Sequence, residues 1–411
     1  MSVVNFMENL LAGAEIGWPL LGEVTKYEQP TKYLVKAKNY SDEFAIPVLT
    51  AGKTFILGYT DETSGIYNAS ENPVIIFDDF TTANKWVDFD FKAKSSAMKM
   101  ISSNDETKYL LKYVYYWLNT LPSELVEGDH KRQWISNYAN KKIPIPCPEN
   151  PKKSLEIQAE IVRILDAFTA MTAELTAELN LRKKQYNYYR DQLLSFTEGE
   201  VEWKTLGEVG EFIRGKRFTK NDYVENGGIK AIHYGEIYTH YGTSSTSTIS
   251  QVRSDLAESL RYAETNDVIV ASVGETIEDV GKAVAWLGSG KVAIHDDSYA
   301  IRHSLNPKYL SYCLQTDDFI SEKAKYVSRG KVKRLLIDGI SKVRIPIPYP
   351  NNYERSLAEQ ARIVAILDKF DALTNSITEG LPREIELRQK QYEYYRDLLL
   401  SFPKPDAEVA A

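Results

Sequence analysis

One helical segment occurs twice in this chain, almost unchanged. Residues 181–196 and 387–402 align over sixteen positions, and thirteen of those positions carry the same residue. Chance does not produce such a match, so the chain contains an internal duplication about 200 residues long. Any fold must therefore give two copies of one helix a purpose within a single molecule.

The duplication extends upstream of this helix. Each copy of the repeat reads as a first strand, a variable globular region, a basic loop, a proline-alternating strand and a long helix. The variable regions share almost no sequence, whereas the flanking segments match. The matching pairs are WPLLGEV (18–24) with WKTLGEV (203–209), GDHKRQWI (128–135) with GKVKRLLI (330–337), IPIPCP (143–148) with IPIPYP (345–350), and SLEIQAEIVRILDAF (154–168) with SLAEQARIVAILDKF (356–370).

The two long helices carry a coiled-coil pattern. Apolar residues recur mostly at steps of three and four from Ile161 through Met171 to Phe196, with an interruption near Arg182, and from Ile363 to Phe402. This spacing is typical of a heptad seam, and roughly 40 residues make a helix about 60 Å long. Such helices need a partner. The economical partner is the other copy, which predicts an intramolecular coiled coil; the alternative is that each helix packs on its own globular domain.

Two further features concern the length of these helices. The second copy contains Gly380 and Pro382, which should kink or break its helix. The first copy instead carries TAELTAEL (172–179), a four-residue unit written twice. Four residues are slightly more than one turn, or about 6 Å of rise, so the unit can be gained or lost with little change to the apolar face. We interpret it as a length-setting element.

Composition limits the class of protein. A chain of 411 residues with 43% hydrophobic and 26% charged residues predicts a globular protein of two or more domains. No apolar run has the length of a membrane span, and we expect no signal peptide. Two cysteines and five scattered histidines give no zinc spacing. AGKT (51–54) lacks the first glycine of a P-loop, because Pro47 stands there, and no motif predicts catalysis.

Local charge points to DNA although the net charge is −7. Residues 323–344 hold eight Lys or Arg and one acid, and residues 128–142 hold four Lys or Arg and one acid. A glycine opens the basic loop in both copies, which permits a close approach to phosphates. The alternative is a solvated charged face, and recurrence at one repeat position favours DNA binding.

Polar residues at the tips of β-rich runs are candidates for reading bases. The runs are IPVLTAGKT (46–54) and IKAIHYGEI (229–237). The RGKRF segment (214–218) adds three more cations. Residues 78–86 and 295–299 are either base contacts or turns. The predicted DNA-binding residues are Thr50, Lys53, Lys85, His130, Lys131, Arg132, Arg214, Lys216, Arg217, His233, Tyr234, Glu236, Arg329, Lys331, Lys333 and Arg334.

The QYxYYRD segments of the helices are either seam and flank residues or a docking surface for another protein. The candidate docking residues are Gln185, Tyr186, Tyr189, Arg190, Gln391, Tyr392, Tyr395 and Arg396.

The repeated IPIPxP, SLxxQxxIVxILDxF and LRxKQYxYYRDxLLSF motifs resemble the specificity subunits of type I restriction-modification systems, particularly their IC class. TAELTAEL is similar to the spacer repeat of that class, and residues 25–100 resemble one of its target-recognition domains. The implied fold is α+β, with two mixed, β-rich target-recognition domains separated by two long antiparallel helices that form an intramolecular coiled coil with a pseudo-twofold repeat. The expected domains are 1–150 (first recognition domain), 151–200 (first spacer helix), 201–352 (second recognition domain), 353–402 (second spacer helix) and 403–411 (disordered tail).

The resemblance also implies partners and a division of labour. Each recognition domain would read one half of a bipartite site in double-stranded DNA, and the helices would set the gap and dock two methyltransferase subunits. Two motor-nuclease subunits can join. This chain would be non-catalytic and bind no cofactor or metal, with S-adenosylmethionine, ATP and Mg in the partner subunits. We expect a cytoplasmic, nucleoid-associated prokaryotic protein without a membrane partner.

Two rival functions follow from the residues alone. A coiled-coil adaptor with two protein-binding heads would show no salt-dependent DNA binding. A stand-alone nuclease or methyltransferase would be active without partners, and would need a catalytic motif.

Overall fold

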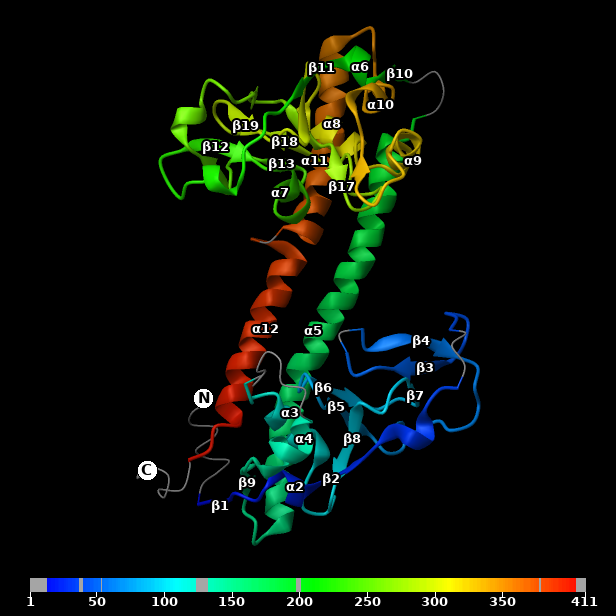
Figure 1. The fold of residues 1–411 in the computed structure, drawn as a ribbon, viewed down its shortest axis with the longest axis vertical. Coiled ribbons are helices and arrows are strands. Elements are labelled where there is room, and N and C mark those ends of the chain that lie inside the picture. Colours follow the sequence, from blue (N-terminus) through cyan, green and yellow to red (C-terminus); the bar gives the residue numbers. More distant parts are fainter. Residues whose placement is uncertain are drawn as a thin grey trace. The chain divides into compact units, whose positions relative to one another are not determined.

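The computed structural model describes residues 13–36, 40–52, 54–122, 132–196, 201–376 and 378–403 (Figure 1). Lys53, His130, Lys131 and the tail from residue 404 lie outside these ranges. The chain forms two compact units: unit 1 comprises residues 1–173 and 387–411, and unit 2 comprises residues 174–386. Each unit therefore takes one long-helix segment from the other half of the chain.

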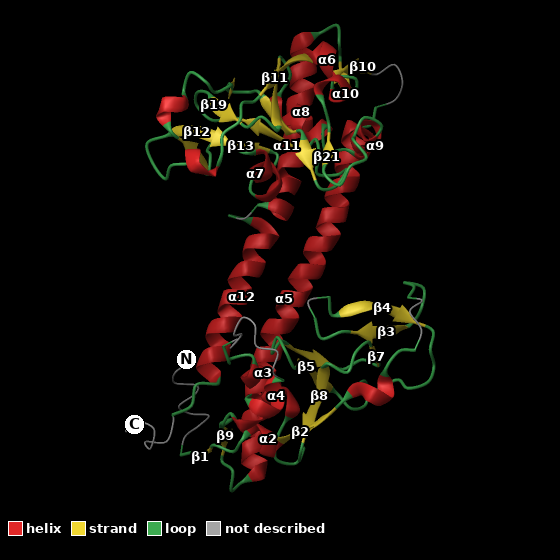
Figure 2. Ribbon diagram, viewed as in Figure 1, coloured by secondary structure: helices red, strands yellow, loops and turns green. Residues whose placement is uncertain are grey.

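Unit 1 contains a four-stranded antiparallel sheet in the order β2-β8-β5-β6 and a three-stranded sheet in the order β4-β3-β7 (Figure 2). Its strands are β1 (Ile16–Gly17), β2 (Thr25–Glu28), β3 (Ile46–Leu49), β4 (Ile56–Thr60), β5 (Val74–Asp78), β6 (Asn84–Val87), β7 (Lys92–Ala93), β8 (Met98–Ser103) and β9 (Ile145–Pro146). Its helices are α2 (Leu21–Val24), α3 (Leu111–Leu118), α4 (Gln133–Ser136), the first part of α5 (Pro151–Leu194) and the last part of α12 (Gly380–Leu399).

Unit 2 contains a five-stranded sheet in the order β11-β20-β16-β18-β13 and a four-stranded sheet in the order β14-β12-β19-β15. Its strands are β10 (Val201–Thr205), β11 (Gly210–Arg214), β12 (Ile229–Ile232), β13 (Ser244–Ser245), β14 (Ser250–Val252), β15 (Tyr262–Ala263), β16 (Val268–Ala271), β17 (Val273–Gly274), β18 (Ala283–Trp286), β19 (Val292–Ile294), β20 (Ser298–His303), β21 (Lys333–Arg334) and β22 (Arg344–Pro348). Its complete helices are α6 (Leu206–Val209), α7 (Tyr234–Thr239), α8 (Pro307–Cys313), α9 (Asp317–Ala324), α10 (Ile337–Ile340) and α11 (Tyr353–Asn375).

The two units share a topology that their variable sequences conceal. β2-β8-β5-β6 and β11-β20-β16-β18 follow the same order, and all their pairings are antiparallel. The first strand of each repeat pairs with its proline-alternating strand, Ile16 opposite Pro146 and Val201 opposite Pro348. The register is therefore the same in both copies, and the predicted internal repeat is a structural one.

A long helix packs on its own domain in each unit and also on the end of the other copy's helix. In unit 1, Ile161 and Leu165 of α5 share a core with α3 and with Leu399 of α12. In unit 2, Ile363 and Leu367 of α11 share a core with α8 and with Leu194 of α5. The paired segments run antiparallel within each unit (Figure 1). The α+β fold with antiparallel helix pairing is confirmed. Each long helix packs both on the other copy and on its own globular domain, so the two alternatives for the helices both hold.

Equivalent aromatic pairs form these helix contacts. Phe168 stacks on Tyr395 in unit 1, with ring centroids 5.1 Å apart and planes at 20°. Phe370 stacks on Tyr189 in unit 2 at 5.5 Å and 25°. Phe168 corresponds to Phe370, and Tyr189 corresponds to Tyr395, so the same contact is made twice with the partners exchanged.

A buried glutamine joins each long helix to its recognition domain. The Oε1 atom of Gln158 accepts a hydrogen bond from the Leu110 amide at 2.8 Å, and Gln360 accepts one from the Asn306 amide at 2.8 Å. Both glutamine side chains are fully buried. A lysine adds an ion pair to the same helix in each unit, Lys112–Asp166 at 2.9 Å and Lys308–Asp368 at 2.8 Å.

Two expectations about helix length are settled. Helix α5 is continuous over 44 residues, whereas the second copy ends at Asn375 and resumes at Gly380, as Gly380 and Pro382 predicted. Gly380 has φ +73°, and a Cβ atom there would lie 2.3 Å from the Ala372 carbonyl oxygen, so glycine is required. The predicted seam position Met171 has a side chain that is 42% exposed, so the seam is not buried at that position. Within the described residues, no helix combines the length and apolar character needed to cross a bilayer.

Candidate DNA interface and docking surface

Five of the predicted DNA-binding residues line one open pocket in unit 2. The pocket has a volume of about 500 Å³ and includes Arg214, Arg217, His233, Tyr234 and Arg334. They come from the end of β11 and the loop after it, the start of α7, and β21. The sheets thus bring together side chains that lie up to 120 residues apart in the sequence (334 minus 214).

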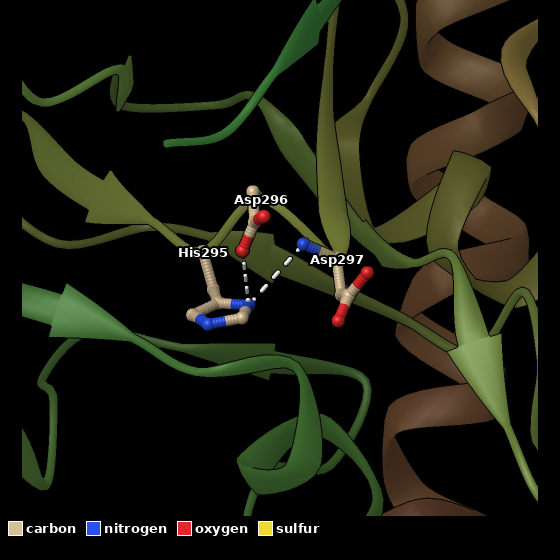
Figure 3. A group of neighbouring side chains, drawn as sticks. All are labelled: His295, Asp296 and Asp297. Atoms are coloured by element: carbon tan, nitrogen blue, oxygen red, sulfur yellow. Dashed lines mark hydrogen bonds and ion pairs between the residues drawn. The ribbon is translucent and has the colours of Figure 1, made fainter. Parts of the chain in front are cut away.

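Three residues of the HDDSY segment, His295, Asp296 and Asp297, also line the pocket. The His295 Nδ1 atom lies 3.2 Å from the Asp297 amide nitrogen and 3.2 Å from an Asp296 carboxylate oxygen (Figure 3). Because a backbone amide can only donate, Nδ1 of the neutral ring accepts this bond. Burial lowers the pKa of His295, which favours that neutral form.

These three side chains could ligate a cation, since their ligand atoms lie within 4.8 Å of one another. Arginines oppose that use. Arg334 pairs with the Asp297 carboxylate at 3.2 Å, and the Arg214 guanidinium donates to the Asp296 carbonyl at 3.3 Å. One of the two carboxylates is already paired with an arginine, so we expect the cluster to organise the pocket and not to bind metal.

The side chain of His233 is held by a nearby backbone amide and by two neighbouring rings. Its Nδ1 atom accepts a hydrogen bond from the Gly235 amide at 3.1 Å. Its ring centroid lies 4.4 Å from that of His295 and 4.4 Å from that of Tyr234. Burial, with a smaller contribution from His295, lowers the pKa of His233 to about 4, so this ring is neutral near pH 7.

Glu236, a predicted base-reading residue, accepts two hydrogen bonds from its surroundings. One carboxylate oxygen accepts from the His233 amide at 3.1 Å, and the other accepts from the Ser250 hydroxyl. The first bond completes a capping box at the start of α7. Both oxygens thus accept hydrogen bonds from within the chain, and the role of Glu236 in DNA binding stays a prediction.

The basic loop of unit 2 begins after α9 and ends on β21. Arg329, Lys331 and Arg334 are exposed, Lys333 is half-buried, and the β21 strand pairs with Val273 and Gly274 of β17. Lys323 belongs to the same basic run but is buried, and its ammonium donates to the carbonyls of Glu278 and Val280. It therefore supports a loop and cannot contact DNA.

Both basic loops end on an equivalent hydrogen bond. The residue after Arg334 donates its amide to the Ser272 carbonyl at 2.9 Å, and the residue after Arg132 donates to the Asp79 carbonyl at 2.8 Å. Arg132 and Lys216 are both exposed. The residues that follow Arg132 and Arg334 thus contact their sheets in the same manner.

The remaining candidates of unit 1 lie in separate places. The Thr50 hydroxyl donates to the Thr54 carbonyl at 2.6 Å and closes a turn after β3. Lys85 is exposed on β6. Asp78 accepts from the Phe80 amide at 2.9 Å, which identifies the start of the 78–86 segment as a turn.

The predicted docking tyrosines divide into buried and exposed positions. Tyr186 and Arg190 are buried in unit 2, and Tyr392 is half-buried in unit 1. Tyr189 and Tyr395 form the aromatic stacks described above. Gln185 accepts from Arg182, Gln391 accepts from Arg388, and Arg396 pairs with Asp397, so these polar groups make contacts along their own helices.

Sequence reasoning missed the residues that are most exposed. Leu181 and Tyr188 are each 61% exposed in unit 2, and Leu387 and Tyr394 are 43% and 64% exposed in unit 1. Seven residues separate the members of each pair, so each pair lies on one helix face. We call these the Leu–Tyr patches. Their identity in both copies was the signal available in the sequence.

Comparison with known proteins identifies the family. Residues 20–182 and 198–387 both match the family described as the type I restriction modification DNA specificity domain. The chain is 59% identical to the type I restriction enzyme EcoR124I/EcoR124II specificity subunit of Escherichia coli over 99% of each chain. It is 32% identical to a putative type I restriction enzyme specificity subunit of Haemophilus influenzae, covering 97% of this chain and 98% of that protein.

A solved structure shares the fold. The crystal structure of a type I restriction-modification S subunit from M. genitalium superimposes with a TM-score of 0.55 at 16% identity, covering 95% of this chain and 97% of that one. This chain belongs to the type I restriction-modification specificity subunits. It is the DNA specificity component of such a system, non-catalytic itself, while cofactors reside in the methyltransferase and restriction subunits with which it forms a complex.

Proposed function

We propose that each unit reads one half of a bipartite DNA site, and that the two Leu–Tyr patches dock two methyltransferase subunits. The observation that carries this proposal is the exchanged aromatic stacking, Phe168 on Tyr395 and Phe370 on Tyr189. It makes the two units equivalent in construction although one chain forms both. Equivalent units can present equivalent surfaces to two copies of one partner, as symmetric assemblies do.

DNA contact would occur at the equivalent basic loops and at the pocket of unit 2. Exposed Arg132 and Arg334 occupy the same anchored position in their loops. Arginine and lysine at such positions neutralise phosphates and set the register, while side chains on the sheets read base edges. Unit 2 concentrates Arg214, Arg217 and Arg334 around its pocket.

The docking surface would be apolar and modest in each unit. An exposed leucine and an exposed tyrosine lie about two turns apart on one helix face. They suit the centre of a protein interface, where aromatic residues are enriched. Motor-nuclease subunits would join the complex through the methyltransferases. The complex would act in the cytoplasm, where DNA and the other subunits meet.

Helix α5 would set the gap between the half-sites. It contributes residues to both units as one continuous helix, and TAELTAEL lies in its exposed middle section. A four-residue unit changes the helix length by about 6 Å, close to the rise of two base pairs.

The experiment that tests this function is methylation mapping. We would co-express the chain with its methyltransferase subunit and map N6-methyladenine across the host genome. A two-part motif with a fixed gap is the expected result. An assembled complex that adds no methylation and shows no salt-dependent DNA binding would contradict the proposal and favour the adaptor function.

A further inference from the structure

The pocket of unit 2 presents hydrogen-bond donors in a fixed orientation. The Nδ1 atom of His233 accepts a bond from the Gly235 amide, so the proton of the neutral ring must sit on Nε2. Stacking against His295 and Tyr234 limits the ring's rotation. His233 is therefore a directional, uncharged donor.

Several polar groups of the pocket already have partners within the chain. Asp297 pairs with Arg334, the Asp296 carbonyl accepts from Arg214, and the Thr219 hydroxyl bonds to Asp222. Arg217 differs from them. It is exposed and forms no ion pair or hydrogen bond within the described part of the chain.

The free groups match one base edge better than the others. In the major groove guanine presents two acceptors, O6 and N7, whereas adenine adds a donor, cytosine presents a donor, and thymine adds a methyl group. Arg217 and His233 are both donors, and guanine alone offers two acceptors without a donor or a methyl group. We propose that Arg217 and His233 read a guanine in the half-site of unit 2, an inference that rests on the proposed function.

A phosphate is the competing ligand for the same donors. A charged histidine would serve a phosphate, but burial keeps His233 neutral near pH 7. A neutral ring adds little Coulomb attraction to an anion, while its direction suits a base edge. Arg217 could serve either ligand, so the experiment must separate base reading from charge.

The test uses the full chain in complex with its methyltransferase subunit and duplexes that carry the mapped site. Each guanine is replaced in turn by 7-deazaguanine, which lacks N7, or by 2-aminopurine, which lacks O6. We expect one guanine at which an analogue weakens wild-type binding by at least about fivefold. His233→Phe and Arg217→Lys should each bind that analogue and guanine with nearly equal affinity.

Controls separate this result from misfolding and from charge. His240→Phe changes an exposed histidine at the end of the same helix and should retain full discrimination. Arg217→Lys keeps the charge on an exposed residue, so it tests the donor geometry even if His233→Phe fails to fold. Melting temperatures of all variants are measured alongside.

Four outcomes would overturn the inference. Variants that still discriminate as the wild type does would exclude these residues as readers. Variants that weaken every duplex equally, with a smaller salt dependence, would show a phosphate contact. A two-part methylation motif whose guanines all tolerate both analogues would refute guanine reading while leaving the proposed function intact; the absence of any DNA binding would refute both.

Discussion

Individual cations in this chain have opposite roles, and burial distinguishes them. Lys99 and Lys323 are buried, and the ammonium of Lys323 holds the loop at Glu278 and Val280. Desolvation lowers the pKa of Lys323 to about 8. Arg329 and Lys331, six to eight residues later, are exposed to solvent. The charge available to DNA is therefore smaller than the basic run of 323–344 suggests.

Replacing both Lys333 and Arg334 with alanine should weaken DNA binding without unfolding unit 2. Arg334 loses one ion pair to Asp297, but that pair is half-exposed and worth less than about 1 kcal/mol. If both residues contact phosphates, the slope of log K against log salt should fall by about 2. Binding is measured by fluorescence anisotropy at several salt concentrations.

The matched control replaces Lys152 and Lys153 at the start of α5. It removes the same charge away from the basic loops, so its salt slope should stay close to that of the wild type. An unchanged slope in the Lys333/Arg334 variant would show that these residues form a solvated charged surface and do not contact DNA phosphates.

At the scale of the element, adjacent tyrosines of one helix face different surroundings. Tyr189 stacks on Phe370 while its neighbour Tyr188 is 61% exposed, and Tyr395 and Tyr394 repeat the arrangement. Consecutive helical residues point about 100° apart, so one position serves the helix pair and the next faces outward. The YYR motif thus combines a packing role and a surface role.

Alanine at Tyr188 and Tyr394 should abolish methyltransferase docking and leave stability nearly unchanged. Alanine at Tyr189 and Tyr395 should instead lower the free energy of unfolding by about 1–2 kcal/mol at each site, because the aromatic stack is lost. Denaturant unfolding and analytical ultracentrifugation with the partner subunit measure the two effects. Normal docking by the first variant would place the partner elsewhere.

Deleting one TAEL unit from α5 should shorten the DNA gap and preserve both half-sites. The change removes about 6 Å of helix and slightly more than one turn, so each unit keeps its own core. Methylation mapping reads the gap directly. Replacing one TAEL by four alanines retains the length of the helix and should leave the gap unchanged. A gap that stays the same after the deletion would contradict the proposal that helix α5 sets the gap.

At the scale of the whole molecule, one chain builds the same unit twice from exchanged parts. The second helix of the pair in unit 1 is the end of α12, which belongs to the second repeat. The second helix of the pair in unit 2 is the end of α5, which belongs to the first repeat. The same backbone conformation recurs where the proline-alternating strand meets the helix, with φ of 46° at Cys147 and 48° at Tyr349. The duplication therefore preserves details that the sequence identity of the variable regions does not reveal.

Because the units are equivalent, Gln158→Leu and Gln360→Leu should destabilise them to a similar extent. Each change leaves a buried amide without its acceptor, Leu110 in one unit and Asn306 in the other. An unsatisfied buried group costs about 1–3 kcal/mol. Hydrogen exchange at those amides measures the loss unit by unit, and Gln192→Leu on the surface of α5 serves as a control. A large effect in only one unit would contradict the equivalence.

The repeat, the long helices, the break before Gly380 and the family could all be predicted from the sequence, because heptad spacing, proline, glycine and long identities are local patterns. The domain boundaries and site residues stay predictions. Only tertiary structure decided which tyrosines are exposed, that Glu236 caps a helix, and that Lys323 is buried. It also brought Arg214, His233 and Arg334 to one pocket. These facts depend on contacts between distant segments, and no periodicity along the chain records such contacts.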